Sequence, residues 1–378
     1  MSSAADAVRS AIRRSGPITF DRFMAEALYG PGGFFATGRG AGRAARDFVT
    51  SPQVGALFGA LVARELDEQW VGLGRPDPFV VIEVGAGSGR LARDILRAEP
   101  ACTAALRYVL VEGSPGLRAE QPQHVALDAP EVVLGPFAVE EPDEPPEPVL
   151  GTGPLVCSLD DLPARRVDGV VFANELLDNL PFGVAERTAD GWCEVRVGLD
   201  GDEFTEVLVP CAAPPTHGIA VPVGVRVPID RALTPWLQRA ARCLRRGSVV
   251  LVDYVVAMAD IVERSPHWLR TYAHHARGSE PLAYPGAYDI TADVVSEHLV
   301  DAASRAGLVV VDDTSQADWL RSLGLDDLVS QARSTWEEQA HIGGLEALAA
   351  RSRVHEAAAL TDPEGLGAFR VVRLAAHR

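Results

Sequence analysis

Closely spaced glycines and an acid just ahead of them are the residues of this chain that most directly suggest chemistry. The apolar run 80–82 leads into Glu83, which is followed by Gly85, Gly87 and Gly89. Glycines let a backbone turn approach a ligand closely, and they leave the first amides of the following helix pointing at that ligand. The segment predicts a nucleotide site, although such a turn also occurs as a plain connection between a strand and a helix.

The glycine spacing favours a methyl donor over a dinucleotide. A dinucleotide site has the pattern Gly-x-Gly-x-x-Gly over a pyrophosphate, whereas the last interval here is one residue shorter. An acid two positions ahead of the first glycine would repel a phosphate but suits a cation. S-adenosylmethionine carries an ammonium and a sulfonium group and no phosphate. We therefore predict it as the cofactor, with Glu83 and the glycine amides at its methionyl end.

A second acid, Glu112, supports this interpretation. It ends the predicted strand 107–112, at the distance past the glycines where a β-α-β unit places the residue that grips both ribose hydroxyls. Glu112 is therefore the predicted ribose ligand. Asp160, which follows the strand predicted at 154–158, is either a contact for the adenine amine or an acid in a surface turn.

Polar residues at the end of the buried strand 168–173 form the second half of the predicted site. Asn174, Glu175 and Asp178 follow that strand directly. In open α/β sheets ligands bind outside the carboxyl ends of the strands, so these side chains should face the same crevice as the glycine turn. Glu175 and Asp178 are three positions apart and can share one helical face. The alternative is that Asn174 and Asp178 only cap a helix.

The elements that must position these residues indicate an α/β fold. Helices are predicted at 4–14, 20–29 and 51–71, core strands at 79–84, 107–112, 154–158, 168–173 and 249–254, and further strands at 301–311 and 368–374. Asp190-Gly191 and Asp200-Gly201 are hairpin signals within a small antiparallel sheet. The acidic, proline-rich stretch 140–148 is an expected exposed loop.

We expect four parts along the chain. They are an N-terminal helical region at 1–75, a Rossmann-like core at 76–254 with a β insertion at about 182–228, a cover or substrate-binding insertion at 255–300, and a C-terminal part at 301–378 that completes the core.

The bulk composition limits the class of protein. The chain has 378 residues, of which 47% are hydrophobic, so it can bury a sizeable core. No apolar stretch approaches the roughly 20 residues of a membrane span, and the N-terminus lacks the apolar centre of a signal peptide, so we expect no membrane contact and a cytoplasmic location.

The net charge of -17 argues against nucleic-acid binding and suits a cationic substrate or a basic protein partner. The five cysteines have no metal-site spacing, so no metal is expected.

Motifs along nearly the whole chain resemble those of the MidA-like methyltransferases. They are Ala27-Leu28-Tyr29-Gly30, Asp47-Phe48-Val49-Thr50-Ser51-Pro52, Glu83 to Gly89, Asn174-Glu175 with Asp178, Asp253-Tyr254, Leu269-Arg270 with Tyr272 and His275, Pro285-Gly286 with Asp289-Ile290-Thr291, Gln316 with Leu320, and Gly367-Ala368-Phe369-Arg370-Val371. The mitochondrial member of that family is an assembly factor for respiratory complex I that dimethylates an arginine of a partner subunit.

The resemblance implies a class I methyltransferase fold with a helical N-terminal region, inserted hairpins and a cover. With the Glu-x-x-Asp spacing, it supports Glu175 and Asp178 as the catalytic pair that orients a guanidinium. Tyr272 and His275 are expected substrate contacts. The remaining residues predicted to bind the cofactor are Thr50, Ser51 and Asn174; Thr50 and Ser51 could equally cap a helix.

Three departures from the family pattern leave the acceptor open. Arg46 and Val255 replace usual glycines, and Asp293 replaces a usual histidine. The leading hypothesis is a protein arginine methyltransferase. The alternatives are a small-molecule N- or O-methyltransferase on the same scaffold and a non-catalytic assembly or binding factor. The number of methyl groups and the oligomeric state stay open, with a dimer as one candidate.

Overall fold

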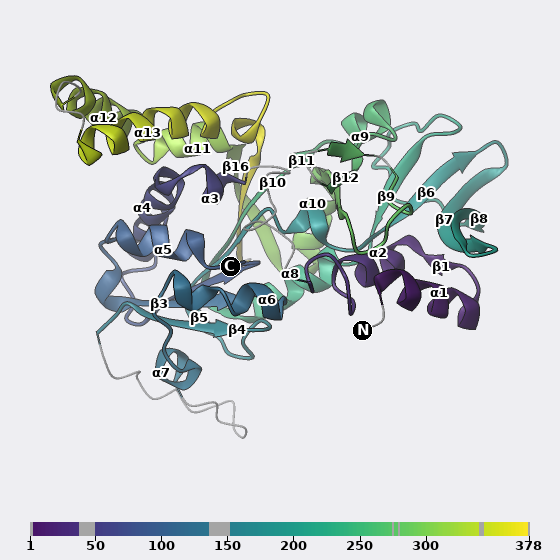
Figure 1. Cartoon of the computed structure of the whole chain (residues 1–378), viewed down its shortest axis with the longest axis horizontal. Helices are drawn as coiled ribbons and strands as arrows, with labels where there is room; N and C mark the ends of the chain where they lie inside the picture. The colour runs from purple at the N-terminus through teal and green to yellow at the C-terminus, as the bar shows by residue number, and fades with distance from the viewer. Residues whose placement is uncertain are drawn as a thin grey trace.

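The computed structural model describes residues 3–37, 50–135, 152–273, 276–278, 280–339 and 344–376. It has a large α/β core and a smaller β-rich part beside it (Figure 1). The core sheet has seven strands in the order β16-β17-β10-β5-β2-β3-β4. Their bounds are β2 (Phe79–Val84), β3 (Leu106–Val111), β4 (Leu155–Leu159), β5 (Val167–Asn174), β10 (Leu244–Asp253), β16 (Leu308–Ser315) and β17 (Arg370–Ala376).

Five of the core strands are parallel, and β17 lies antiparallel between β10 and β16. Every residue of β2 and β3 is buried, as expected of parallel strands that are covered on both faces. The strands approach closely at Gly169, where an added Cβ would lie 1.8 Å from the Val80 carbonyl oxygen. In the sheet, β2 lies between β3 and β5, so the connections from β2 and from β5 lead away in opposite directions. A crevice opens between them at the carboxyl ends of the strands.

Helices cover both faces of the core sheet (Figure 1). On one face lie α4 (Ala56–Gly72), α5 (Arg90–Arg97), α11 (Gln316–Ser322) and α13 (Leu345–Leu360), which pack on alternate strand residues such as Val81 and Val170. On the other face lie α8 (Leu233–Arg242) and α10 (Ser296–Arg305), which pack on Val80 and Val171. α12 (Leu325–Gln339) lies alongside α13 at the yellow end of the chain in Figure 1.

The second part is a five-stranded antiparallel sheet with two N-terminal helices. It consists of β1 (Ile18–Thr19), β6 (Phe182–Thr188), β7 (Gly191–Asp200), β8 (Glu203–Cys211) and β9 (Arg226–Asp230), with α1 (Ala4–Ser15) and α2 (Phe20–Leu28) packed against it. Both hairpin signals join the strands as expected. The stretch 1–75 is therefore divided, because α1 and α2 contact this sheet whereas α4 covers the core sheet.

The remaining elements are short. They are α3 (Ser51–Val54), α6 (Pro115–Arg118), α7 (Pro130–Leu134), α9 (Met258–Arg264), β11 (Val255–Val256), β12 (Leu269–Ala273), β13 (Ala276–Gly278), β14 (Asp289–Ala292), β15 (Val294–Val295) and four 3₁₀ turns, η1 (Thr103–Ala105), η2 (Gln121–Gln123), η3 (Leu177–Asn179) and η4 (Leu366–Ala368). Across the described ranges no helix combines the length and the apolar character that a membrane crossing requires.

Two element predictions were wrong in part. The helix predicted at 51–71 is divided into α3 and α4 at Gly55, where an added Cβ would lie 2.1 Å from the Glu356 side chain. The strand predicted at 301–311 begins only at Leu308, because 296–305 is helical. The buried residues Leu299, Ala302 and Ala303 have the spacing of one helical face.

Candidate functional site

A pocket of about 740 Å³ lies at the carboxyl ends of the core strands. Ten of the residues predicted for the site line it: Thr50, Glu83, Gly85, Gly87, Glu112, Asp160, Asn174, Glu175, Asp178 and Tyr272. His275 lies outside the described residues. Two others lie behind the wall of the pocket. Gly89 precedes the first residue of α5, and Ser51 begins α3 and is fully buried.

The three glycines of the turn after β2 all have left-handed backbone conformations. Their φ values are 74° for Gly85, 54° for Gly87 and 83° for Gly89, a region that side chains with a Cβ rarely adopt. At Gly85 an added Cβ would also lie 3.0 Å from a methyl carbon of Leu176. The glycines therefore shape the turn that presents its backbone to the pocket.

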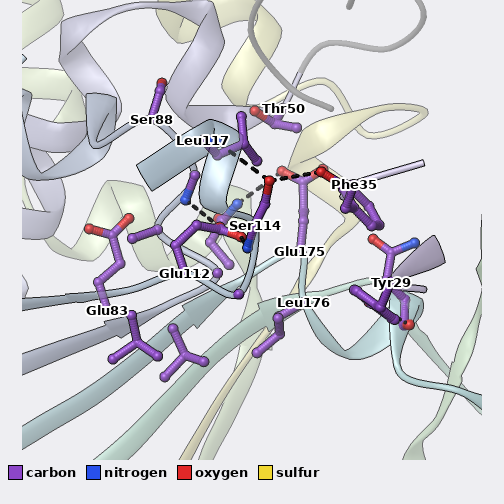
Figure 2. Close-up of a pocket in the computed structure, with 18 of the residues that line it drawn as sticks. Tyr29, Phe35, Thr50, Glu83, Ser88, Glu112, Ser114, Leu117, Glu175 and Leu176 are labelled. Atoms are coloured by element: carbon purple, nitrogen blue, oxygen red, sulfur yellow. Dashed lines mark hydrogen bonds between the residues drawn. The ribbon is translucent and has the colours of Figure 1, made fainter. Parts of the chain in front are cut away.

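Glu112 links this turn to the loop after β3. Its two carboxylate oxygens accept hydrogen bonds from the Gly87 amide at 2.9 Å and the Ser114 amide at 2.7 Å. The Ser114 hydroxyl donates to the Phe35 carbonyl at 2.7 Å, so the N-terminal segment is joined to the same loop (Figure 2). Burial raises the pKa of Glu112, and these backbone bonds oppose the shift. Each carboxylate oxygen has a second lone pair for a hydroxyl donor.

Glu83 is a deeply buried acid that lines the pocket just ahead of the glycine turn. Its side chain is 4% exposed, and the Tyr108 hydroxyl donates to it at 2.8 Å. Burial raises the pKa of Glu83 to about 8. A cation placed beside it would favour the ionised form and lower that pKa.

The raised pKa of Glu83 predicts a measurable pH dependence of stability. In the folded protein this carboxyl retains its proton from the unfolded value of about 4.3 up to about 8, so rising pH favours the unfolded chain across that window. Glu83→Gln, which cannot titrate, should gain stability relative to wild type by about 1 kcal/mol per pH unit between pH 5 and 8. Chemical denaturation of both proteins without cofactor measures the difference. A difference that does not change with pH would contradict the assignment.

Glu175 occupies an unusual backbone conformation at the end of β5. Its φ is 52°, which is uncommon for a residue with a side chain. One carboxylate oxygen, Oε1, accepts hydrogen bonds from the Ser51 amide at 3.2 Å and the Asn174 side-chain amide at 3.0 Å. The other, Oε2, is buried and has no hydrogen-bond partner among the described residues. Burial, followed by the nearby Asp178 carboxylate, raises the pKa of Glu175 to about 8.

Asp178 also keeps one oxygen free. It lies in η3, where its Oδ2 accepts from the Thr291 hydroxyl at 2.6 Å, while Oδ1 is buried without a partner within the described part of the chain. Burial raises the pKa of Asp178 to about 6. The same cause, with the Asp178 charge, raises the pKa of Asp289 to about 7.

This end of the pocket therefore holds a cluster of buried acids whose ionised forms are disfavoured. Asp253 is 1% exposed behind it, where it accepts from the Leu176 and Leu177 amides. The nearby cation Arg270 already pairs with Asp293, one of the three departures from the family pattern. Like charges held together out of water favour either protonation or a bound cation.

Several pocket residues were missed from the sequence. Tyr29 donates from its hydroxyl to the Asn179 carbonyl at 2.9 Å and stacks on Phe35 with ring centroids 5.5 Å apart. The Asn179 side-chain amide donates to Asp289 at 2.8 Å. Tyr29 and Asp289 both belong to motifs shared with the MidA-like methyltransferases, but the residues next to them in the sequence gave no sign of a binding or catalytic role.

The other residues predicted for the site make fewer contacts that indicate a role. The Thr50 side chain makes no cap hydrogen bond to α3 although it lines the pocket. Asp160 is exposed at the rim, beside Asp161 and Arg239, which form an ion pair. Of the other two departures, Val255 pairs with Val294 in a two-stranded sheet, and Arg46 lies outside the described residues.

Comparison with known proteins places this geometry in a family. Residues 61–313 match the model of a family described as S-adenosyl-L-methionine-dependent methyltransferases. A methyltransferase-like protein of the COG1565 superfamily from Burkholderia thailandensis, solved bound to S-adenosyl-homocysteine, has a TM-score of 0.79 and 28% identity, covering 98% of this chain and 91% of that one. These findings confirm the predicted fold class and cofactor.

Curated relatives carry a more specific name. The Xenopus tropicalis mitochondrial protein arginine methyltransferase NDUFAF7 is 28% identical over 339 residues, covering 83% of this chain and 74% of its own length. The Drosophila melanogaster homologue is 28% identical over 311 residues, covering 77% of this chain and 68% of its own. Because these relatives are named mitochondrial, the prediction of a cytoplasmic location was wrong. The chain is an enzyme that uses S-adenosyl-L-methionine. It belongs to the family of S-adenosyl-L-methionine-dependent methyltransferases whose model matches residues 61–313.

Proposed function

We propose that this enzyme transfers a methyl group from S-adenosylmethionine to the guanidinium of an arginine in a protein partner. The observation that carries the proposal is a pair of buried carboxylate oxygens, Glu175 Oε2 and Asp178 Oδ1, on residues that line one pocket. Neither oxygen has a hydrogen-bond partner among the residues that the structure describes. A buried acceptor without a donor costs about 1–3 kcal/mol and more when it is charged. A guanidinium supplies five N–H donors in a planar fork and a permanent positive charge.

The cluster of acids at the acceptor end favours a cation over a neutral hydroxyl or amide, because a bound cation would stabilise their ionised forms. Glu175, Asp178 and Asp289 all line the pocket, and burial raises the pKa of each of them. The names of the curated relatives, which are protein arginine methyltransferases, support the same acceptor.

The reaction assigns a separate task to each carboxylate. The bound cofactor supplies an electrophilic methyl group on a sulfonium. Glu175 orients the guanidinium so that one nitrogen lies in line with the methyl–sulfur bond, which makes positioning the main contribution to the rate. As that nitrogen forms its bond to carbon, the electron pair of the broken bond stays on sulfur. The nitrogen then loses a proton, and Asp178 accepts it.

The donor is held by the opposite half of the pocket in this proposal. Glu112 accepts both ribose hydroxyls, Glu83 and the glycine-turn amides hold the methionyl end, and Asp160 contacts the adenine amine. Thr50 and Asn174 line the same space, and Tyr272 contacts the acceptor.

The test is to find where the methyl group goes. The protein is incubated with S-adenosylmethionine labelled in its methyl group and a cell lysate, and the labelled protein is hydrolysed to amino acids. We expect the label in methylated arginine, at a level that Glu175→Gln lowers about 100-fold or more. Label in low-molecular-weight material would favour a small-molecule acceptor, and label in another amino acid would contradict the arginine assignment. No transfer to any fraction would favour a binding factor.

A further inference from the structure

A buried chain of hydrogen bonds connects Glu175 to the C-terminal part of the molecule. The Ser51 amide donates to Glu175 Oε1 at 3.2 Å, and the Ser51 hydroxyl donates to Gln316 Oε1 at 2.9 Å. Gln316 Nε2 donates in turn to the Leu360 carbonyl at 3.1 Å. Ser51 and Gln316 are both 0% exposed. The hydrogen bonds thus join residues that are up to 309 positions apart, and only the Glu175 end of the network lies at the pocket.

We infer that Gln316 is a positioning residue that acts through Ser51 to hold the Glu175 carboxylate in its reactive orientation. The inference rests on the proposed role of Glu175 toward the acceptor. Gln316 does not line the pocket, so it would not touch cofactor or substrate.

Gln316 is itself held at fixed points. Its backbone amide donates to the Phe369 carbonyl at 2.7 Å, and both polar atoms of its side-chain amide are hydrogen-bonded. It is the first residue of α11, directly after β16, and Leu360 is the last residue of α13. Because its Oε1 and Nε2 atoms are both hydrogen-bonded, the Gln316 side chain has little rotational freedom, and it can fix the direction of the Ser51 hydroxyl.

The Glu175 carboxylate needs hydrogen bonds from other residues to hold its orientation, because Glu175 lies outside a regular strand or helix. The residue has a left-handed φ of 52° and follows the last residue of β5. Ser51 belongs to the four-residue helix α3, which is too short to be held by its own hydrogen bonds. If Ser51 shifts, Glu175 Oε1 loses one of its two hydrogen-bond donors. The carboxylate can then rotate, and Oε2 no longer points toward the acceptor.

The test compares Gln316→Met with Gln316→Glu. Methionine has a similar length but neither accepts from Ser51 nor donates to Leu360, so we expect the turnover number to fall about tenfold, a loss of about 1.4 kcal/mol of transition-state stabilisation. The Kd for S-adenosylmethionine should change less than twofold. The acid limb of the pH–rate profile should move to higher pH, because a carboxylate that loses a donor ionises less readily. Glutamate, kept neutral by burial at pH 6.5, accepts and donates like glutamine and should restore the rate at that pH.

Gln69 provides a matched control. It accepts from the Ser248 hydroxyl at 3.0 Å and donates to Glu65 at 2.7 Å, so it bridges elements as Gln316 does but away from the pocket. Gln69→Met should lower the melting temperature without changing the turnover number or the pH–rate profile.

The outcomes separate this inference from the proposed function. If Gln316→Met has the wild-type turnover number and pH profile while Glu175→Gln is inactive, the inference is wrong and the proposed function stands. If Glu175→Gln is fully active, the proposed role of Glu175 is wrong. Where Gln316→Met does not fold, Ser51→Ala removes only the hydroxyl link, and the same tenfold loss is expected. A wild-type rate in Ser51→Ala overturns the inference.

Discussion

Replacing Glu175 by glutamine should lower the turnover number about 100- to 1000-fold, the range seen when one preorganised group is removed from a transition state. The amide has nearly the same size and can still accept from Ser51, but it carries no charge to orient and stabilise a guanidinium. The donor half of the pocket is unchanged, so the Kd for S-adenosylmethionine should stay within about twofold. Steady-state kinetics and calorimetry measure the two quantities.

Glu206→Gln is the control for loss of one negative charge. Glu206 lies on β8, where it pairs with Arg226 and does not line the pocket. Its turnover number should equal that of wild type. A Glu175→Gln protein that keeps more than about half of the wild-type turnover would show that the carboxylate takes no part in the reaction.

Replacing Glu112 by alanine should weaken cofactor binding by about 1.5–3 kcal/mol, or about 10- to 150-fold in Kd. The loss has two sources. The ribose hydroxyls lose their acceptor, and the Gly87 and Ser114 amides lose the carboxylate that holds them in place. Glu112→Gln keeps one oxygen acceptor and should lose less affinity than alanine.

Calorimetric titration with S-adenosyl-homocysteine checks this second prediction without an acceptor. Glu131→Ala is a suitable control, because Glu131 is exposed on α7 and does not line the pocket. Unchanged affinity in Glu112→Ala would remove Glu112 from the cofactor site.

That the glycine turn and Glu112 would line one pocket could be predicted from the sequence, because the signals are local. The glycine turn and Glu112 lie in a β-α-β unit, whose strand and helix lengths fix how far apart in sequence two strand ends occur. The same rule brought Glu175 and Asp178 to the pocket, since parallel strands end at the same edge of a sheet.

The Tyr29–Asn179 contact and the buried network could not be predicted, because they depend on contacts between distant parts of the chain. Tyr29 and Asn179 are 150 positions apart, and Ser51 and Gln316 are 265 positions apart. No periodicity or spacing encodes such a pair. Ser51 was expected to cap a helix or to contact the cofactor, and no local signal indicated that its amide and hydroxyl connect two other side chains. The division of the predicted helix 51–71 likewise depends on Glu356, a residue far along the chain.

The orientation of the bound cofactor tests the central claim most directly. A crystal structure with S-adenosyl-homocysteine should show both ribose hydroxyls on Glu112, with the sulfur directed toward Glu175 Oε2 and Asp178 Oδ1. A nucleoside bound with its sulfur away from these two oxygens, or bound outside the pocket, would contradict the account.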